Sequence, residues 1–267
     1  MYRIHPILCG TLSIPKDSTT YLTDRDVELV FPVYTFLLRS EDGADPTVLV
    51  DAGVKAADSA FMRSEGREVG PPGGGPEPLL DGLAEHGVTP GDVDYLVLTH
   101  LHHDHVANVP AFPDAELLVQ RAEWEAARDP VPILSRVYVE EDLEAVAAAD
   151  PTLLDGGYRL HRDVELLPAP GHSEGMQSVV VRTEAGPHAL VGDLAYTQHN
   201  LNPGLESIVD ARGERLETNP VDADYLPPGL HVDVRACYTS VRRVRERVGE
   251  EGVLLGSHDA EMADAYP

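Results

Sequence analysis

The order of predicted strands and helices predicts a layered α/β or α+β domain. Apolar, β-branched runs bounded by glycine, proline or aspartate predict strands at residues 27–38, 47–51, 95–99, 117–120, 177–183, 188–192 and 253–256. Helical spacing of apolar residues predicts helices at residues 79–86, 122–128, 140–148 and 232–248. Because strands and helices are interspersed along the chain, a helical bundle or a solenoid is disfavoured.

The last helix has the clearest pattern, and two other stretches are irregular. Residues 232–248 place valines at helical spacing with arginines between them. Residues 69–78 are rich in proline and glycine, which excludes a helix or a central strand there. Residues 200–229 are acidic, aperiodic and rich in the same two residue types. We expect one domain over residues 1–267, with a lid or insertion at residues 200–229.

The composition is that of a globular protein without a disulfide framework. Apolar residues make up 42% of the 267 residues, enough for a substantial core. Cys9 and Cys237 are far apart and form no C-x-x-C pair, so any metal must be held by nitrogen and oxygen. No apolar run approaches the roughly 18 residues of a membrane span. Since residues 1–17 also lack a signal-peptide pattern, we expect a cytoplasmic protein.

The charge balance is strongly acidic. The chain has 46 acidic and 20 basic residues and a net charge of −26, and its only lysines are Lys16 and Lys55. Such a surface repels phosphate backbones and anionic lipids, so neither nucleic acid nor a membrane is expected as a partner. Self-repulsion also destabilises the compact state unless salt screens it. The composition therefore predicts adaptation to a high-salt cytoplasm, and an ordinary acidic protein is the alternative.

A cluster of histidines follows the strand predicted at residues 95–99. His100 and His102 lie two residues apart in an extended segment and should project in the same direction. Asp104 and His105 follow in a turn and project differently, so one segment could supply ligands to two metal ions. Imidazole and carboxylate ligands suit zinc, and also iron, manganese or cobalt. An accidental histidine tract that binds metal without catalysis is the alternative.

Three later residues could complete such a site. His172 follows Gly171, Asp193 follows Gly192, and His258 comes after a short predicted strand. Each alone would more simply be a turn or capping residue. Together with the histidine cluster, they indicate a catalytic metal site assembled from distant segments.

In this order, the motifs H-x-H-x-D-H, G-H, G-D and a late histidine resemble those of the metallo-β-lactamase-fold hydrolases. The resemblance extends from the turn Asp51-Ala52-Gly53 to His258. It implies an αββα sandwich with two mixed sheets. Within that family the chain is most similar to the N-acyl-homoserine lactone lactonases, through residues 119–127, 170–178 and 193–196.

The resemblance also implies the role of each residue. It assigns His100, His102 and His172 to one metal ion, Asp104, His105 and His258 to a second, and Asp193 to both. Tyr196 would hydrogen-bond the substrate carbonyl. Two divalent ions, Zn²⁺ first, would generate a bridging hydroxide that attacks a lactone ring. Asp104 would transfer the proton to the leaving oxygen.

His103 departs from the lactonase pattern, in which this position usually carries an apolar aromatic residue that lines the acyl pocket. We expect His103 to face away from the metals and to form a pocket wall. The expected partner is a small, neutral ester or lactone, and the protein could be a monomer or a homodimer. A thioester hydrolase of the glyoxalase II type and a non-catalytic metal-binding protein remain the alternatives.

Adaptation to salt predicts a salt-dependent melting temperature. Raising KCl from about 0.1 M to above about 1 M should raise the melting temperature by several degrees, because salt screens repulsion among the excess carboxylates. Differential scanning calorimetry at a series of KCl concentrations measures this dependence. A melting temperature indifferent to molar salt contradicts the prediction.

Overall fold

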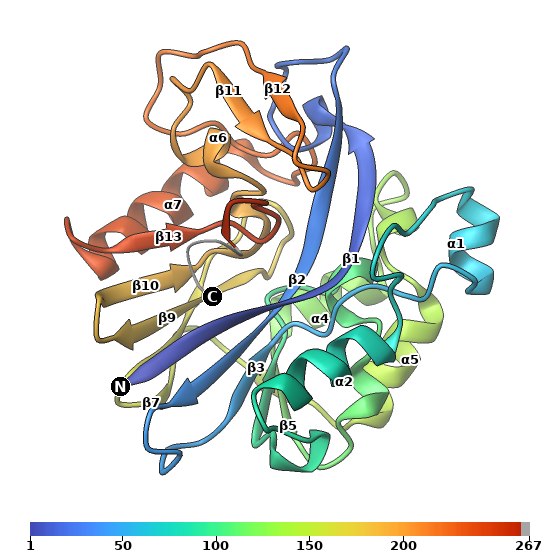
Figure 1. Cartoon of the computed structure of the whole chain (residues 1–267), viewed down its shortest axis with the longest axis vertical. Helices are drawn as coiled ribbons and strands as arrows, with labels where there is room; N and C mark the ends of the chain where they lie inside the picture. The colour runs from blue at the N-terminus through green and yellow to red at the C-terminus, as the bar shows by residue number, and fades with distance from the viewer. Residues whose placement is uncertain (263–267) are drawn as a thin grey trace.

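Two β-sheets pack face to face and helices cover their outer faces in the computed structural model of the chain (Figure 1). The structure describes residues 1–262. The larger sheet has the strand order β1-β2-β3-β4-β5-β6, and the smaller one has the order β13-β10-β9-β8-β7. Both sheets contain parallel and antiparallel pairs. The predicted α+β class and αββα sandwich are therefore confirmed.

The sheets and helices have the following bounds. The larger sheet contains β1 (Tyr2–Pro15), β2 (Glu28–Ser40), β3 (Val48–Val50), β4 (Tyr95–Val97), β5 (Glu116–Gln120) and β6 (Thr152–Leu154). The smaller sheet contains β7 (Tyr158–His161), β8 (Val164–Pro168), β9 (Gln177–Thr183), β10 (Gly186–Leu190) and β13 (Val253–Leu255). A separate hairpin pairs β11 (Ser207–Val209) with β12 (Arg215–Glu217). The helices are α1 (Ala60–Glu65), α2 (Pro76–Glu85), α3 (His103–Val106), α4 (Arg121–Arg128), α5 (Glu140–Ala148), α6 (Gln198–Leu201) and α7 (Val234–Val248).

The alternation of side chains along the strands produces the layers. Val48 and Val50 of β3 point into the core between the sheets, whereas Leu49 points to the opposite face and packs with the helices. In β9, Val179 and Val181 enter the same central core, and Val180 packs towards α7. Strands buried on both faces read as continuous apolar runs, which explains the runs in the sequence.

Helices bury one apolar stripe each against the outer faces of the sheets. On the larger sheet, the helix side chains that join the core are Leu79 and Leu83 of α2, Ala127 of α4 and Val146 of α5. On the smaller sheet α7 contributes Cys237, Val241, Val244 and Val248. Val241, Val244 and Val248 of the predicted pattern thus form the buried stripe, whereas Val232 precedes the helix and Val234 is half-buried.

Parallel strand pairs bring distant loops to one end of the molecule. β3 and β4 run parallel, so the loops after Val50 and Val97 leave the larger sheet at the same edge. β10 and β13 also run parallel, and the loops after Leu190 and Leu255 leave the smaller sheet together. Ligands at the carboxyl ends of parallel strands can therefore meet although they are distant in sequence.

Two segments differ from the sequence-based expectations. The sequence predicted no strand before residue 27, yet β1 spans 14 residues and pairs antiparallel with β2. Residues 200–229 contain the end of α6 and the β11–β12 hairpin, and Ile208 of that hairpin packs with Leu12 and Leu29. The stretch is therefore more ordered than its composition suggested. Its movement as a lid stays a prediction.

Both lysines are buried in ion pairs. Lys16 Nζ lies 2.6 Å from Asp24 Oδ2 and 2.8 Å from His199 Nδ1, and its side chain is fully buried. Lys55 Nζ lies 2.6 Å from Asp142 Oδ1. Burial alone would raise the pKa of Asp24, but the hydrogen bond and charge of Lys16 outweigh it and lower that pKa. This contribution to stability is present above the ordinary pKa of aspartate and is lost as the pH falls through the lowered value.

Replacing Lys16 with Met should lower the free energy of unfolding by about 3 to 5 kcal/mol, because the Asp24 carboxylate would remain buried without its cation. Urea denaturation of the wild type and the variant measures the difference. The double variant Lys16→Met/Asp24→Asn serves as the control and should recover part of the loss. A Lys16→Met variant as stable as the wild type would show that the pair contributes nothing.

Candidate metal centre

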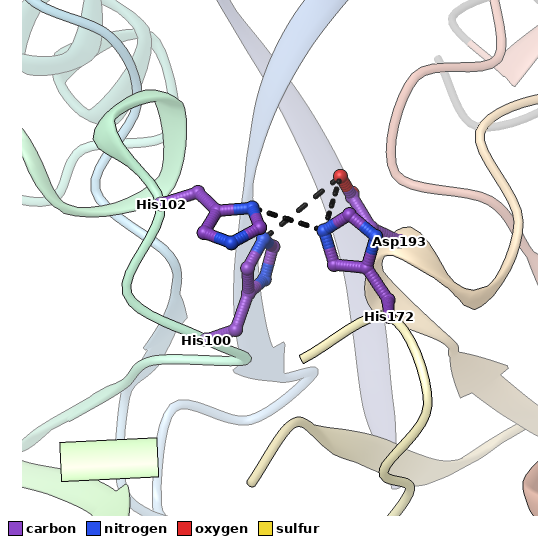
Figure 2. A group of neighbouring side chains, drawn as sticks. All are labelled: His100, His102, His172 and Asp193. Atoms are coloured by element: carbon purple, nitrogen blue, oxygen red, sulfur yellow. Dashed lines mark hydrogen bonds and ion pairs between the residues drawn. The ribbon is translucent and has the colours of Figure 1, made fainter. Parts of the chain in front are cut away.

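Seven side chains from both halves of the sandwich converge at one end of the two sheets. Two groups of potential ligands form there, and within each group the ligand atoms lie within 4.8 Å of one another. The first group is His100, His102, His172 and Asp193, and the second is Asp104, His105 and His258. Figure 2 shows the imidazoles of the first group pointing towards one another and towards the Asp193 carboxylate. The resemblance divided the six other residues in the same way and assigned Asp193 to both ions, whereas this grouping places Asp193 with the first three histidines.

The fold positions these residues in loops and short helices that follow strands. β4 ends at Val97, so His100 and His102 lie in the extended loop beyond it rather than on the strand itself. Asp104 and His105 belong to the single turn of α3, which begins after His102. This change from extended to helical backbone redirects the side chains, as the sequence predicted for a turn.

The remaining three residues come from the smaller sheet. His172 lies in the loop between β8 and β9, Asp193 in the short 3-10 turn after β10, and His258 after β13. Backbone hydrogen bonds from Ser257 N to Ala195 O and from His258 N to Tyr196 O, both 3.0 Å, join the last two loops. The Asp193 and His258 loops are therefore held as one unit.

Asp193 faces both groups with different oxygens. Its Oδ2 lies 3.9 Å from His100 Nε2 and 3.4 Å from His172 Nε2. Its Oδ1 lies 3.4 Å from His105 Nε2 and 3.2 Å from His258 Nε2. A carboxylate in this position can share one oxygen with each of two cations.

The hydrogen bonds of the histidines leave a set of nitrogens that fits metal ions. The Nδ1 atoms of His105, His172 and His258 lie 2.7–2.8 Å from Asp51 Oδ2, Leu230 O and Pro32 O. An Nδ1–H that donates to oxygen leaves the Nε2 lone pair directed away from that oxygen. The Nε2 atoms of His100, His105 and His258 are buried and have no hydrogen-bond partner among the described residues. Orphaned buried nitrogens are costly, and cations at the centre would satisfy them.

The protonation of the groups also suits cation binding. Burial, followed by repulsion from neighbouring imidazoles, lowers the pKa of His100 and His102 well below the ordinary value, so both carry free lone pairs near neutral pH. Burial disfavours the Asp104 carboxylate, but the charges of His105, His103 and His258 outweigh it and lower the pKa of Asp104 to about 2. Burial also opposes charge on His105, where Asp193, Asp51 and Asp104 nevertheless raise the pKa. The carboxylates around His105 thus stabilise positive charge at the centre, and bound cations would supply it.

Two buried carboxylates, Asp51 and Glu123, hold the ligands in place, and neither was assigned a role from the sequence. Asp51, whose backbone φ is +63°, accepts hydrogen bonds from Thr99 N at 2.7 Å and from His105 Nδ1 at 2.8 Å. Glu123 accepts from Leu101 N at 3.0 Å and from Ser173 Oγ at 2.6 Å, so it connects the His100–His102 loop to the His172 loop. Asp51 belongs to the D-x-G turn and Glu123 to residues 119–127, two segments that carried the resemblance, but neither residue was singled out within its segment.

A cavity of about 360 Å³ adjoins the site, and its wall includes His102, Asp104 and Tyr196. Tyr196 is 4% exposed, and burial followed by the charge of Asp193 raises its pKa well above the ordinary value, so its hydroxyl stays protonated. His103 belongs to neither ligand group. It lines the cavity, as expected of a pocket wall. Its Nε2 atom lies 3.2 Å from Arg67 Nη1, and its ring is tilted by 52° against the Phe61 ring at a centroid distance of 5.1 Å.

A protein-family comparison agrees with this geometry. The family described as the metallo-beta-lactamase superfamily matches residues 29–251. The chain belongs to this superfamily. The predicted family and the hydrolase class are therefore confirmed, and metal binding is expected of the fold, while the identity of the metal stays open.

Individual relatives point in the same direction. An N-acyl homoserine lactonase from a Bacillus species is 33% identical over 88% of this chain and 84% of its own length. One from Bacillus cereus is 32% identical over 97% and 94% of the two chains. The structure of an N-acyl homoserine lactone hydrolase with N-hexanoyl-L-homoserine at its catalytic metal centre has a TM-score of 0.74 at 24% identity, over 98% and 95% of the two chains.

Among the described residues, no helix is long and apolar enough to cross a membrane.

Removing the charge of Asp51 should weaken metal binding. In the Asp51→Asn variant His105 loses its carboxylate partner, and loss of such a partner costs about 10- to 100-fold in metal affinity. Competition with a chromophoric chelator measures the zinc affinity. Asp129→Asn, at an exposed residue outside the site, is the control and should bind zinc like the wild type. Equal affinity in the wild type and Asp51→Asn contradicts the assignment.

Proposed function

We propose that this hydrolase opens the lactone ring of N-acyl homoserine lactones at a site for two divalent cations. The observation that carries the proposal is the position of Asp193 between two buried ligand groups, beside a cavity that Tyr196 and Asp104 line. The lactonase relatives support the choice of substrate, since they match over most of their own length. The proposed ligands are His100, His102, His172, Asp104, His105 and His258, with Asp193 shared between the cations.

When bound, two cations of the zinc type would polarise a carbonyl oxygen and make water nucleophilic near neutral pH. The residues of this chain then bind and orient the ester. The protonated Tyr196 hydroxyl donates a hydrogen bond to the lactone carbonyl oxygen, where negative charge develops. The ionised Asp104 carboxylate accepts a proton from the attacking water and returns it to the ring oxygen as the C–O bond breaks.

The proposed ligands are five imidazoles and two carboxylates, one of which is shared. Zinc binds such donors and is the first candidate metal, although iron, manganese and cobalt accept them too. The reacting ring is uncharged, so its approach is not opposed by the net charge of −26. Nucleic acid is disfavoured by the same charge. A cytoplasmic location and adaptation to high salt remain part of the proposal.

A panel of acyl homoserine lactones and acylglutathione thioesters, assayed at low and molar KCl, tests the function. Metal content is measured on the same sample. We expect the lactones to be hydrolysed and the thioesters to be poor substrates in protein that contains about two metal ions per chain. Faster thioester hydrolysis would assign the glyoxalase II type of activity, and metal without turnover of either class would identify a binding protein.

The Tyr196→Phe variant should lose about 100-fold in kcat, because the transition state loses a hydrogen-bond donor at the carbonyl oxygen. Its metal content should be unchanged, since no ligand is altered. Steady-state kinetics with N-hexanoyl homoserine lactone measures the effect. Tyr238→Phe, on α7 away from the cavity, is the matched control and should keep the wild-type kcat. A kcat unchanged in Tyr196→Phe would remove Tyr196 from the mechanism.

A further inference from the structure

The cavity beside the metal centre differs in charge from the rest of the protein. The chain as a whole carries a net charge of −26. The cavity wall, however, includes two arginines, Arg67 and Arg136, and a single carboxylate, Asp104. Since Asp104 is a proposed ligand, bound cations would neutralise it. The pocket that receives the substrate is therefore positive inside a negative surface.

Arg67 is held in the wall by a histidine rather than by a carboxylate. Its Nη1 lies 3.2 Å from His103 Nε2. Because a guanidinium keeps its protons, it must be the donor, and His103 is the neutral tautomer with its proton on Nδ1. A neutral partner leaves the full positive charge of Arg67 uncompensated.

The geometry also leaves donors available. Guanidinium groups offer five N–H donors, and the bond to His103 uses one. Within residues 1–262, neither Arg67 nor Arg136 forms an ion pair with a carboxylate. Among the described residues, other arginines such as Arg25 and Arg128 also lack a carboxylate partner. What distinguishes Arg67 and Arg136 is their position on the wall of one cavity beside the proposed metal ligands.

Arg67 is close enough to the proposed reaction centre to act on the substrate. Arg67 lines the same cavity as Tyr196 and Asp104. The apolar part of the wall is formed by Leu12, Ile14, Phe31 and Val137, which can accept methylene groups. The cavity thus combines apolar side chains, the Tyr196 hydroxyl and two cationic groups in one wall.

We propose that the preferred substrate is a lactone whose acyl arm ends in a carboxylate. Arg67 binds this carboxylate, and Arg136 adds positive charge to the same cavity wall. This inference rests on the proposed lactone hydrolysis and specifies the acyl group of its substrate. Guanidinium and carboxylate match in two parallel hydrogen bonds, which gives orientation as well as affinity. His103 fixes the Arg67 side chain, and an aromatic hydrocarbon at this position could not accept its N–H.

The matched substrates are N-hexanoyl and N-adipoyl homoserine lactone, together with the neutral adipamoyl amide of the latter. Six-carbon arms are chosen because a related hydrolase binds N-hexanoyl-L-homoserine at its metal centre. At low salt the metal-loaded wild type should hydrolyse the adipoyl lactone with a kcat/KM at least about tenfold above that of the other two. The advantage should persist in molar KCl, because salt screens long-range repulsion by the acidic surface more than the short-range contact with Arg67.

Arg67→Gln should abolish this advantage, so that the ratio of kcat/KM for the adipoyl and hexanoyl lactones falls to within about twofold of one. His103→Phe should shift the preference in the same direction, since it removes the acceptor that holds Arg67. Arg63→Gln is the control. It removes the same charge from the neighbouring helix α1, does not line the cavity, and should keep the adipoyl preference.

The outcomes separate the two proposals. Hydrolysis of the hexanoyl lactone without an adipoyl advantage, or an advantage that survives Arg67→Gln, overturns this inference and leaves the lactonase function intact. Equal gains for the adipoyl and adipamoyl lactones show hydrogen bonding without charge recognition and also overturn it. If no lactone is hydrolysed, the proposed function fails. Calorimetric titration of metal-loaded wild type and Arg67→Gln with adipic acid monoamide and hexanamide then decides carboxylate binding directly.

Discussion

The Asp193 carboxylate faces both ligand groups, and this arrangement requires one relative position of the two sheets. Asp193 lies in the loop after β10 of the smaller sheet, yet it faces His100 and His105 from the larger sheet. Its contacts with His172 and His258 come from its own sheet. A shift of one sheet relative to the other would separate these atoms. The packing of the central core, where Val50 and Val97 meet Val179 and Leu190, therefore determines the geometry of the metal centre.

Burial of so many ionisable groups is expensive, and the surrounding chain offsets the cost with fixed hydrogen bonds. Asp51 accepts bonds from Thr99 and His105 of the segment after β4, whereas Glu123 accepts bonds from two separate loops. A Cβ atom at Gly175 would lie 1.9 Å from the backbone nitrogen of Glu123. Repulsion among the buried ligands remains in the absence of cations. Metal binding and folding should therefore be coupled, because cations remove a repulsion that the hydrogen bonds offset only in part.

The sequence was informative where the chemistry is local. The cluster from His100 to His105 could be recognised because its ligands are adjacent, and the valine period of α7 revealed its buried face. The strand β1 escaped prediction because its pattern of exposure is irregular over 14 residues. The role of Glu123 and the approach of Arg67 to His103 depend on tertiary contacts between separate segments. Such contacts leave no periodicity in the chain, so no local pattern could indicate them.

Charge distribution connects these features. Burial of Lys16 and Lys55 in ion pairs leaves arginine as the only cationic side chain on the surface. Arginine keeps its charge and binds carboxylates in two parallel hydrogen bonds, whereas the many surface acids repel anions from a distance. An anionic substrate arm must therefore cross an unfavourable field before it reaches Arg67. Salt weakens the long-range repulsion more than the short-range contact, because screening grows with distance. A salty solution would thus make the outer surface permissive while the cavity keeps its selectivity, and the acidic surface and the cationic pocket become compatible in one enzyme.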